Sequence, residues 1–125
     1  MSGDQFKYVN IIPRFGKKFE FTDIQDFQIN INSKMLMVGL GDGEFSFLLD
    51  NLRYSEVGLA AQAGKLIFQQ LEVVLMPLAG EQPEIIHVRD IINYEWKVDN
   101  GLLMVFGKTV TMIFHIDQVL SFQSA

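Results

Sequence analysis

The sequence contains no cysteine, and this absence excludes several kinds of site. A disulfide scaffold, a cysteine nucleophile, a cysteine-ligated zinc site and an iron–sulfur cluster all require thiols. Histidine is scarce too, because His87 and His115 are the only two. They do not form an H-x-H, H-x-x-x-H or H-E-x-x-H motif, and the acidic residues follow no EF-hand pattern. The sequence therefore predicts neither a metal site nor a cofactor.

Charge is also low, at 20% of residues with a formal net charge of −5. Phosphate backbones are bound by clustered Lys and Arg, whereas the ten basic residues here are spread along the chain. We therefore expect no nucleic-acid partner. Eleven Phe and six Met beside so few charges indicate more apolar surface than a monomer usually exposes. We expect a protein partner, and a homo-oligomer is one form that this contact can take.

The length of 125 residues fits one domain, residues 1–125, without a linker or low-complexity stretch. The first residues, MSGDQFKYVN, lack the basic and apolar regions of a signal peptide. No apolar run is long enough to span a bilayer. We expect a cytoplasmic protein.

The chain is similar to itself at an offset of 67 residues. Residues 19–38 align with residues 86–105, so that Asp23 meets Asp90 and the Leu-Met-Val of 36–38 meets that of 103–105. Two unrelated sets of amphipathic strands could also look alike. The aligned aspartate, turn and prolines favour duplication of one β unit, with copies at about 6–51 and 71–120.

Within each copy apolar residues recur at every second position, which is the period of a half-buried strand. Turn residues such as Asn32-Ser33 and Asp99-Asn100-Gly101 separate these segments, and Gly41-Asp42-Gly43 indicates a hairpin rather than a phosphate loop. We predict a mainly β fold, a barrel or sandwich of antiparallel meanders, with one central or C-terminal helix. The expected strands are 6–12, 18–23, 25–31, 34–39, 43–49, 71–77, 85–89, 91–98, 102–107 and 109–115.

Residues 55–69 are ambiguous. Leu59, Ala63 and Ile67 share one helical face, although Gly58 and Gly64 each weaken a helix by ~1 kcal/mol. We predict a helix there, and the alternative is a hairpin turning at Ala63-Gly64 before a long strand. A short closing helix is expected from about Asp117.

The two-residue period of the strands also predicts which aromatic residues face the core. Trp96 aligns with a core-facing Ile29 and is expected in the core. Asp23 and Asp26 point to opposite faces at strand spacing, so we expect them in a turn or bulge. We expect Phe19, Phe21, Phe27, Phe45, Phe47 and Phe114 inside, and Phe6, Phe15, Phe68 and Phe122 as contact residues.

Three basic residues lie in the loop PRFGKK. Arg14, Lys17 and Lys18, together with Phe15, form the predicted binding site, for a phosphate-bearing ligand or an acidic partner. The alternative is a solvated loop without a ligand. No serine lies in a nucleophile elbow, and a lone strand histidine is usually structural, so we predict no catalytic residue and no enzyme.

From Lys65 to Asp117 the sequence resembles the pleckstrin-homology-like superfamily with its GRAM and bacterial relatives. The shared features are Asp90-Ile91 entering a strand that carries Tyr94 and Trp96, an Asn-Gly hairpin, and a final strand before a short helix. The resemblance implies a curved barrel closed by a helix that recognises proteins or phosphoinositides. Its lipid-binding loop would correspond to Arg14, Lys17 and Lys18. The following strand carries Phe19, Glu20 and Phe21 in place of the usual Lys/Arg-x-Arg, so we expect no phosphoinositide or membrane contact.

These observations predict a non-enzymatic interaction module that binds a protein partner, including by self-association. The alternative is a carrier that holds an apolar small molecule or lipid inside a barrel lined by Phe and Met. A third, enzymatic hypothesis pairs His87 or His115 with a nearby carboxylate.

Overall fold

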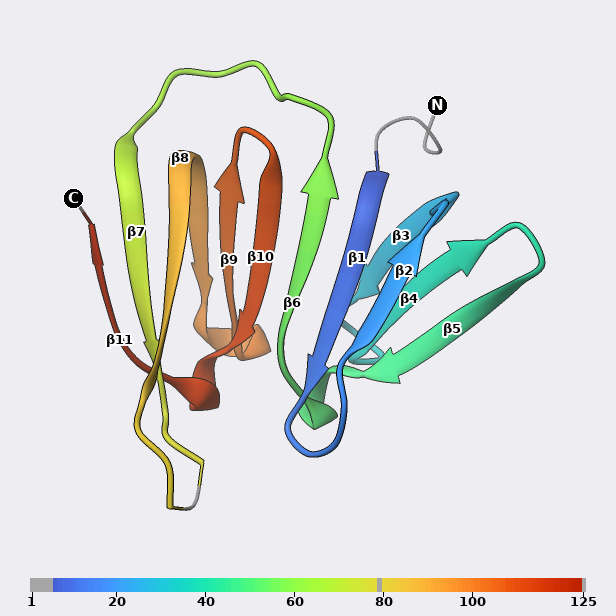
Figure 1. Ribbon diagram of the computed structural model, residues 1–125, viewed down its shortest axis with the longest axis horizontal. Coiled ribbons are helices and arrows are strands. Elements are labelled where there is room, and N and C mark those ends of the chain that lie inside the picture. The colour runs from blue at the N-terminus through green and yellow to red at the C-terminus, as the bar shows by residue number, and fades with distance from the viewer. Residues whose placement is uncertain (1–5, 79, 125) are drawn as a thin grey trace.

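The computed structural model describes residues 6–78 and 80–124, which form two antiparallel sheets (Figure 1). The larger sheet has eight strands in the order β11-β7-β8-β9-β10-β6-β1-β2, and the smaller has the order β3-β4-β5. The predicted mainly β class is confirmed, as an open arrangement rather than a closed barrel. The strands are β1 (Phe6–Pro13), β2 (Phe19–Thr22), β3 (Asp26–Asn30), β4 (Met35–Leu40), β5 (Gly43–Leu48), β6 (Leu52–Leu59), β7 (Phe68–Leu75), β8 (Glu84–Lys97), β9 (Leu102–Gly107), β10 (Val110–His115) and β11 (Val119–Ser124).

Helical structure in the described residues is limited to three single turns. They are η1 (Leu49–Asn51), η2 (Val98–Asn100) and η3 (Ile116–Gln118), each a 3₁₀ turn. Within residues 6–78 and 80–124, no helix has the length and apolar character needed to cross a membrane.

The two halves of the chain, residues 6–59 and 68–124, repeat the same order of elements. β5, η1 and β6 begin 67 positions before β10, η3 and β11, respectively. The turn after β3 and the turn after η2 contain Lys34 and Gly101, also 67 positions apart, with φ of 56° and 71°. This correspondence supports the duplication, which stays a prediction.

The halves differ at one place. In the first half β2 and β3 belong to different sheets, whereas in the second half their counterparts join into the single strand β8. The two strands predicted at 85–89 and 91–98 are therefore one, with a register shift between Ile91 and Asn93 where a bulge bends the strand. β8 pairs with β7 along its first part and with β9 along its second part.

Each half has its own hydrophobic core, and each core takes residues from the other half. The first core contains Val9, Ile11 and Leu36, together with Leu102 and Ile113 from the second half. The second core contains Leu71, Ile91 and Phe114, and Tyr54 of the first half packs against it. Because of this exchange, the two halves share apolar packing.

The helix predicted over residues 55–69 is wrong. Residues up to Leu59 belong to β6, residues 60–67 form an irregular connection, and β7 begins at Phe68. The alternative hairpin is wrong too, because β6 pairs with β1 and β10 and not with β7. β6 is covered on both faces, so its burial does not alternate and the period-two signal is lost. The closing helix is also replaced, by η3 and β11.

The assignment of aromatic residues is correct in part. Phe21 and Phe114 are buried, and Phe27 and Phe47 are half-buried. Phe19 and Phe45 were expected inside, yet each is 47% exposed. They lie on β2 and β5, the last strands of their sheets, where no further described strand covers them.

Candidate functional site

The two halves meet along one strand pair, β6 with β10, which we call the seam. Its register places Met112 opposite Glu56, Ile113 opposite Ser55 and Phe114 opposite Tyr54. Side chains of neighbouring residues point to opposite faces of a sheet, so the seam has two different faces.

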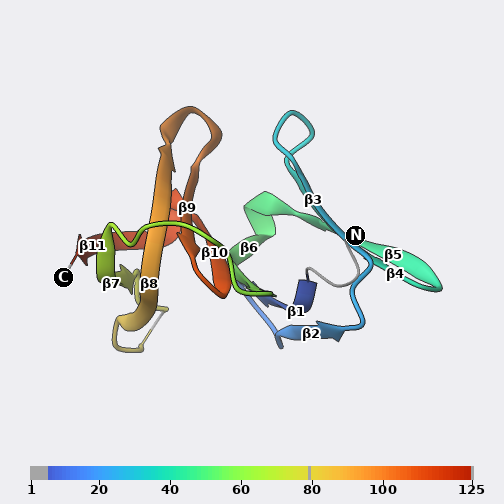
Figure 2. The same cartoon turned by 90° about the horizontal axis from the view of Figure 1, so that it is seen from above.

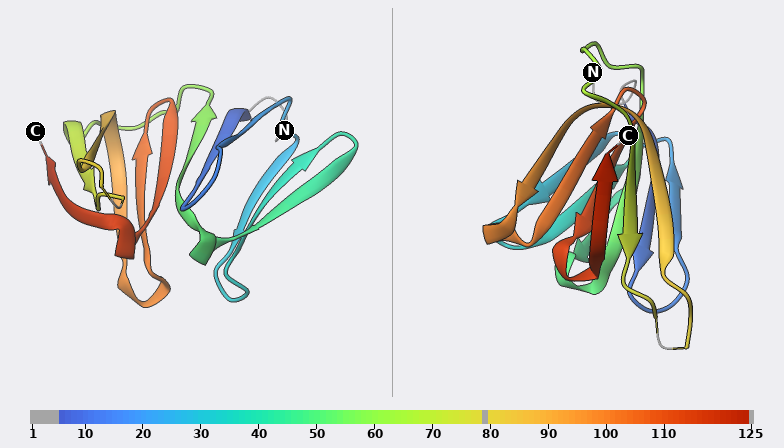
Figure 3. Two further views of the ribbon diagram at one scale, coloured as in Figure 1. Left: turned by 60° about the horizontal axis from the view of Figure 1, so that its bottom comes forward. Right: turned by 90° about the vertical axis from the view of Figure 1, so that its left-hand side faces the viewer.

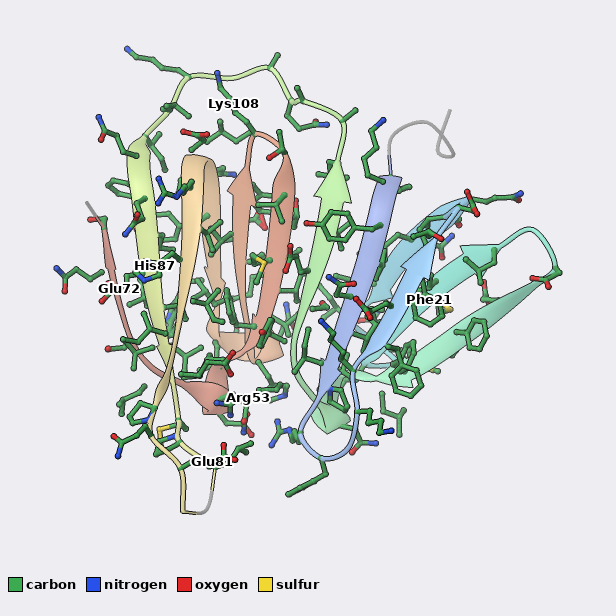
Figure 4. All side chains as sticks on the ribbon, in the orientation of Figure 1. Phe21, Arg53, Glu72, Glu81, His87 and Lys108 are labelled. Carbon is green, nitrogen blue, oxygen red and sulfur yellow. The ribbon has the colours of Figure 1, made fainter. Side chains whose placement is uncertain are left out.

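A buried arginine, Arg53, links the first half to the second half at one end of the seam (Figure 4). Arg53 of β6 is only 4% exposed. Its guanidinium donates to the carbonyl of Met76 at 2.8 Å and to Gln118 Oε1 at 3.0 Å. Glu84 Oε1 lies 3.6 Å from Arg53 Nε. One side chain of the first half thus binds the ends of β7 and η3 in the second half.

One face of the seam carries an apolar groove with a cavity of about 290 Å³. Viewed from above, the β3–β4 and β8–β9 hairpins rise on the same side of the larger sheet (Figure 2). β3 contributes Phe27 to one wall, and its ring lies 6.1 Å from that of Phe6. β9 contributes Met104 and Phe106 to the other wall. Val57, Thr111 and Ile113 of the seam line the same cavity.

The other face of the seam carries a more polar cleft of about 540 Å³. Tyr8, Glu56, His87 and Arg89 line it. Tyr8 donates a hydrogen bond to Glu56. Burial, followed by the hydrogen bond and charge of Glu56, raises the pKa of Tyr8 to about 12. Within this cleft Tyr8 and Glu56 are paired with each other, whereas the groove on the opposite face is apolar.

An exposed aromatic cluster, formed by Phe68, Tyr94, Trp96 and Phe122, lies at the far end of the second half. Ring centroids are 6.1 Å apart for Phe68–Tyr94, 6.2 Å for Tyr94–Phe122 and 5.3 Å for Trp96–Phe122. Tyr94 and Phe122 are each 37% exposed, and Trp96 is 44% exposed. Apolar area of this kind on a surface usually marks a contact site.

The cluster occupies the place that the groove occupies in the first half. Phe6 and Phe68 are the first residues of β1 and β7, the first strands of the two halves, and Phe27 and Tyr94 are 67 positions apart. The Phe68–Tyr94 pair is thus the counterpart of Phe6–Phe27, and both pairs have a centroid distance of 6.1 Å. Ile29 lies in the groove beside β9 and β10, and its counterpart is Trp96. The expectation that Trp96 lies in the core is therefore wrong, because no described strand covers β8 as the second half covers β3.

The outer strands of the two sheets in the described part of the chain are β11 and β2 in the larger sheet and β3 and β5 in the smaller, and each pairs on one side only. β5 pairs only with β4, and β11 pairs only with β7. We call the unpaired sides the outer edges of β5 and β11. Phe45 and Leu48 of β5 are 47% and 52% exposed, and Leu120 of β11 is 54% exposed. Both strands thus offer backbone hydrogen-bonding groups beside exposed apolar side chains.

The predicted basic loop joins β1 to β2. Arg14 turns away from solvent, with its guanidinium 2.7 Å from Asp117 and 3.3 Å from the carbonyl of Leu52. Lys18 lies 3.6 Å from Glu20. Phe15 is 87% exposed, and Lys17 is exposed beside it. The four residues do not converge on a pocket, and the predicted binding role stays a prediction.

His115 links the two 3₁₀ turns that correspond in the two halves. Its Nε2 lies 3.0 Å from Asp50 of η1 in a hydrogen bond, which is the main cause that lowers the pKa of Asp50. Its Nδ1 lies 2.7 Å from Asp117 of η3 but without hydrogen-bond geometry. Asp50 and Asp117 are 67 positions apart, so this histidine joins equivalent positions and has an evident structural role.

His87 is a surface residue of β8 (Figure 4). Its Nδ1 lies 3.0 Å from Gln70 Nε2 and 3.8 Å from Glu72. Among the described residues, no group of three His, Cys, Asp or Glu side chains could hold a metal ion.

No family model matches the chain, and no match was found among curated proteins or solved structures. The resemblance to the pleckstrin-homology-like superfamily therefore stays a prediction. Phe68 and Phe122 were expected as contact residues from the sequence, but their grouping with Tyr94 and Trp96 and the outer edges of β5 and β11 were not. The internal repeat was the one sequence feature that pointed to these edges. It aligns Phe122 with Ser55, a residue of β6 that pairs with β10 in the seam, and so indicates a strand with an equivalent pairing edge.

Proposed function

We propose that the chain is a cytoplasmic, non-enzymatic interaction module that binds a protein partner at the aromatic cluster and the outer edge of β11. The observation that carries this proposal is the position of three exposed aromatic rings directly beside an open strand edge. A strand added to such an edge gains main-chain hydrogen bonds, and side-chain pockets provide specificity. Aromatic residues are also enriched where interfaces concentrate their binding energy.

The test is capture from an extract of the native cell, with the immobilised chain as bait and quantitative mass spectrometry as the readout. The variant Trp96→Ala/Phe122→Ala removes two rings of the cluster. Ile85→Ala is the matched control, because Ile85 is 51% exposed on the same strand but away from the cluster.

We expect captured proteins, whether other chains or the native copy of this one, to fall at least tenfold with the double variant. The control should capture the same amounts as the unmodified chain. Equal capture by the double variant, or no capture by any bait, would contradict the proposal.

The apolar groove favours a second function, the binding of an apolar small molecule. Its cavity of about 290 Å³ is lined mainly by Phe, Ile, Leu and Met side chains, as in apolar ligand sites. This site is an open groove rather than the interior of the barrel that the sequence suggested. Nile red should bind at one saturable site per chain, and Thr111→Phe should weaken binding at least tenfold by filling the cavity.

Thr109→Phe is the control for the dye experiment, because Thr109 lines the polar cleft and not the groove. It should leave Nile red binding unchanged. Non-saturable binding, or equal binding by the two variants, would remove the apolar ligand as a candidate.

A further inference from the structure

We infer that the partner at the outer edge of β11 is a second copy of this chain, which adds its β5 there and repeats the seam between molecules. This inference rests on the proposed function and names its partner. The contact joins different surfaces of the two copies, so it is head-to-tail.

The correspondence between the halves carries the inference. β10 corresponds to β5 and β6 corresponds to β11, both at an offset of 67. The chain pairs β10 with β6 in its interior and leaves β5 and β11 open among the described residues. The outer edges of β5 and β11 are therefore equivalent to the two strands that already pair with each other in the seam.

The same offset gives the register of the intermolecular pair. Ile113 lies opposite Ser55 in the seam, which places Ser46 of one copy opposite Phe122 of the next. Thr111 lies opposite Val57, which places Glu44 opposite Ser124. The side chains are compatible with this pairing, because small Ser46 leaves room for the Phe122 ring and no like charges face each other.

The repeated contact also supplies a cover for the aromatic cluster. Next to the seam, Met104 of β9 packs against the first core, as do Phe27 and Ile29. The counterparts of these three residues are Met37, Tyr94 and Trp96. Met37 of one copy would thus lie against the exposed rings of the next copy, as Met104 lies against the first half within the chain.

The positions of the two edges make the contact intermolecular. β5 and β11 lie at opposite ends of the longest axis of the molecule (Figure 1), and the view in the left panel of Figure 3 shows the same separation. The two edges of one chain therefore do not pair with each other. Repetition of a head-to-tail contact gives a ring if its rotation closes and a filament if it does not.

β11 lacks the features that usually protect an open edge. Its sequence, VLSFQS, contains no charged residue and no proline. Natural proteins commonly place such residues on exposed edge strands to prevent pairing with other chains. An unprotected edge next to exposed aromatic rings is expected where the strand pairs with another chain in the functional protein.

The first test uses two variants that each block one end of the chain. Ser46→Lys places a charge on the outer edge of β5, and Phe122→Lys places one on β11. Circular dichroism and urea unfolding first establish that both variants are folded. Light scattering should show that the unmodified chain grows in mass with concentration, and that each variant alone associates at least tenfold more weakly.

An equimolar mixture of the two variants distinguishes a head-to-tail contact from a symmetric one. The Ser46→Lys copy keeps its β11 edge, and the Phe122→Lys copy keeps its β5 edge, so one contact remains and the mixture should stop at a dimer. A symmetric β11 dimer predicts instead that Ser46→Lys associates as well as the unmodified chain. That result would overturn the inference.

The second test measures the register and does not depend on blocked variants. The chain has no cysteine, so Glu44→Cys and Ser124→Cys, both at exposed positions, introduce single thiols. Mixing the two should give a disulfide-linked dimer under mild oxidation, because directly opposite residues satisfy disulfide geometry. Glu44→Cys mixed with Leu120→Cys should not, because Leu120 is four residues out of register. Equal cross-linking in both mixtures would overturn the register.

The failure of this inference can be separated from the failure of the proposed function. A strict monomer at all concentrations that still captures other proteins through Trp96 and Phe122 would overturn the inference alone. A strict monomer that captures nothing would overturn both.

Discussion

Asp23 and Asp90 lie 67 positions apart and share a left-handed backbone conformation, with φ of 56° and 57°. Asp23 follows β2, in agreement with the expected turn or bulge role, and Asp90 lies within β8 just before its bulge. The Asp90 carbonyl accepts a hydrogen bond from the Lys108 amide at 3.0 Å, which holds the bend against the β9–β10 turn. The same expectation of a turn or bulge is wrong for Asp26, which is the first residue of β3, pairs with Gly39 and accepts a hydrogen bond from the Phe27 amide at 2.9 Å.

Asp90→Val should destabilise the fold by about 1–2 kcal/mol, because a β-branched residue is strained at positive φ. Asp90→Gly should stay within about 1 kcal/mol of the unmodified chain, because glycine adopts this conformation without strain. Asp90 is exposed, so neither substitution removes a buried side chain, and the difference in unfolding free energy reports the backbone conformation. Urea unfolding measures the difference, and equal stability of the two variants would contradict the role of the backbone.

Gly58→Ala should cost about 1–3 kcal/mol through overpacking. Gly58 lies opposite Tyr8 across β6 and β1, and a Cβ at position 58 would overlap the Tyr8 ring. Gly43→Ala is the control, because a Cβ there meets nothing within 4 Å. In a Tyr8→Ala background the cost of Gly58→Ala should shrink, and a double-mutant cycle of urea unfolding free energies tests this coupling.

Stability should fall as the pH rises from about 10 to about 12. Burial is the largest cause that raises the pKa of both Tyr8 and Tyr54 to about 12. Between the unfolded and folded pKa values the unfolded chain has lost these protons and the folded chain has kept them, so the free energy of unfolding decreases with pH. Urea unfolding at several alkaline pH values measures this slope.

The variant Tyr8→Phe/Tyr54→Phe should flatten the alkaline decline, because neither residue can then ionise. Absorbance at the tyrosinate band should show the same two groups resisting ionisation in the folded chain. An unchanged slope in the double variant would assign the decline to other groups.

Arg53→Ala should cost about 2–4 kcal/mol, because it leaves the Met76 carbonyl and Gln118 without their buried donor. Arg14→Ala is the comparison, since its partner Asp117 is 53% exposed. An exposed pair contributes at most about 1 kcal/mol, so this variant should be nearly as stable as the unmodified chain. Equal losses in urea unfolding would mean that Arg53 does not fasten the halves.

The sequence predicts most strands to within a few residues, because one face of each is apolar and the other is polar. β4, β5, β9 and β10 all begin within one residue of the expected positions. Two strands were missed for physical reasons. β6 is covered on both sides, so it lacks the alternation of buried and exposed residues that identifies a strand. β11 is largely exposed, so its apolar and polar side chains do not alternate between a buried and a solvent face.

The candidate site could be predicted only in part: Phe68 and Phe122 were expected as contact residues, but the exposure of Trp96 depends on neighbouring strands rather than on local pattern. Ile29 and Trp96 occupy the same place in the repeat, and an identical environment was the natural expectation. The second half covers Ile29, whereas no described strand covers Trp96, which is 44% exposed. Each unit of a repeat is covered by a neighbouring unit on one side only, so an apolar residue that is covered in one unit can be exposed at the equivalent position of the other.

The central place of β6 has a consequence for synthesis of the chain. β6 pairs with β1, which precedes it, and with β10, which begins only at Val110. During synthesis β1 is made before β6, so β6 can pair with it at once, but the other side of β6 stays without its partner until β10 has been made. Such non-local pairing slows folding and prolongs the exposure of a strand edge. The first half therefore has an unpaired strand edge in β6 for as long as β10 is missing.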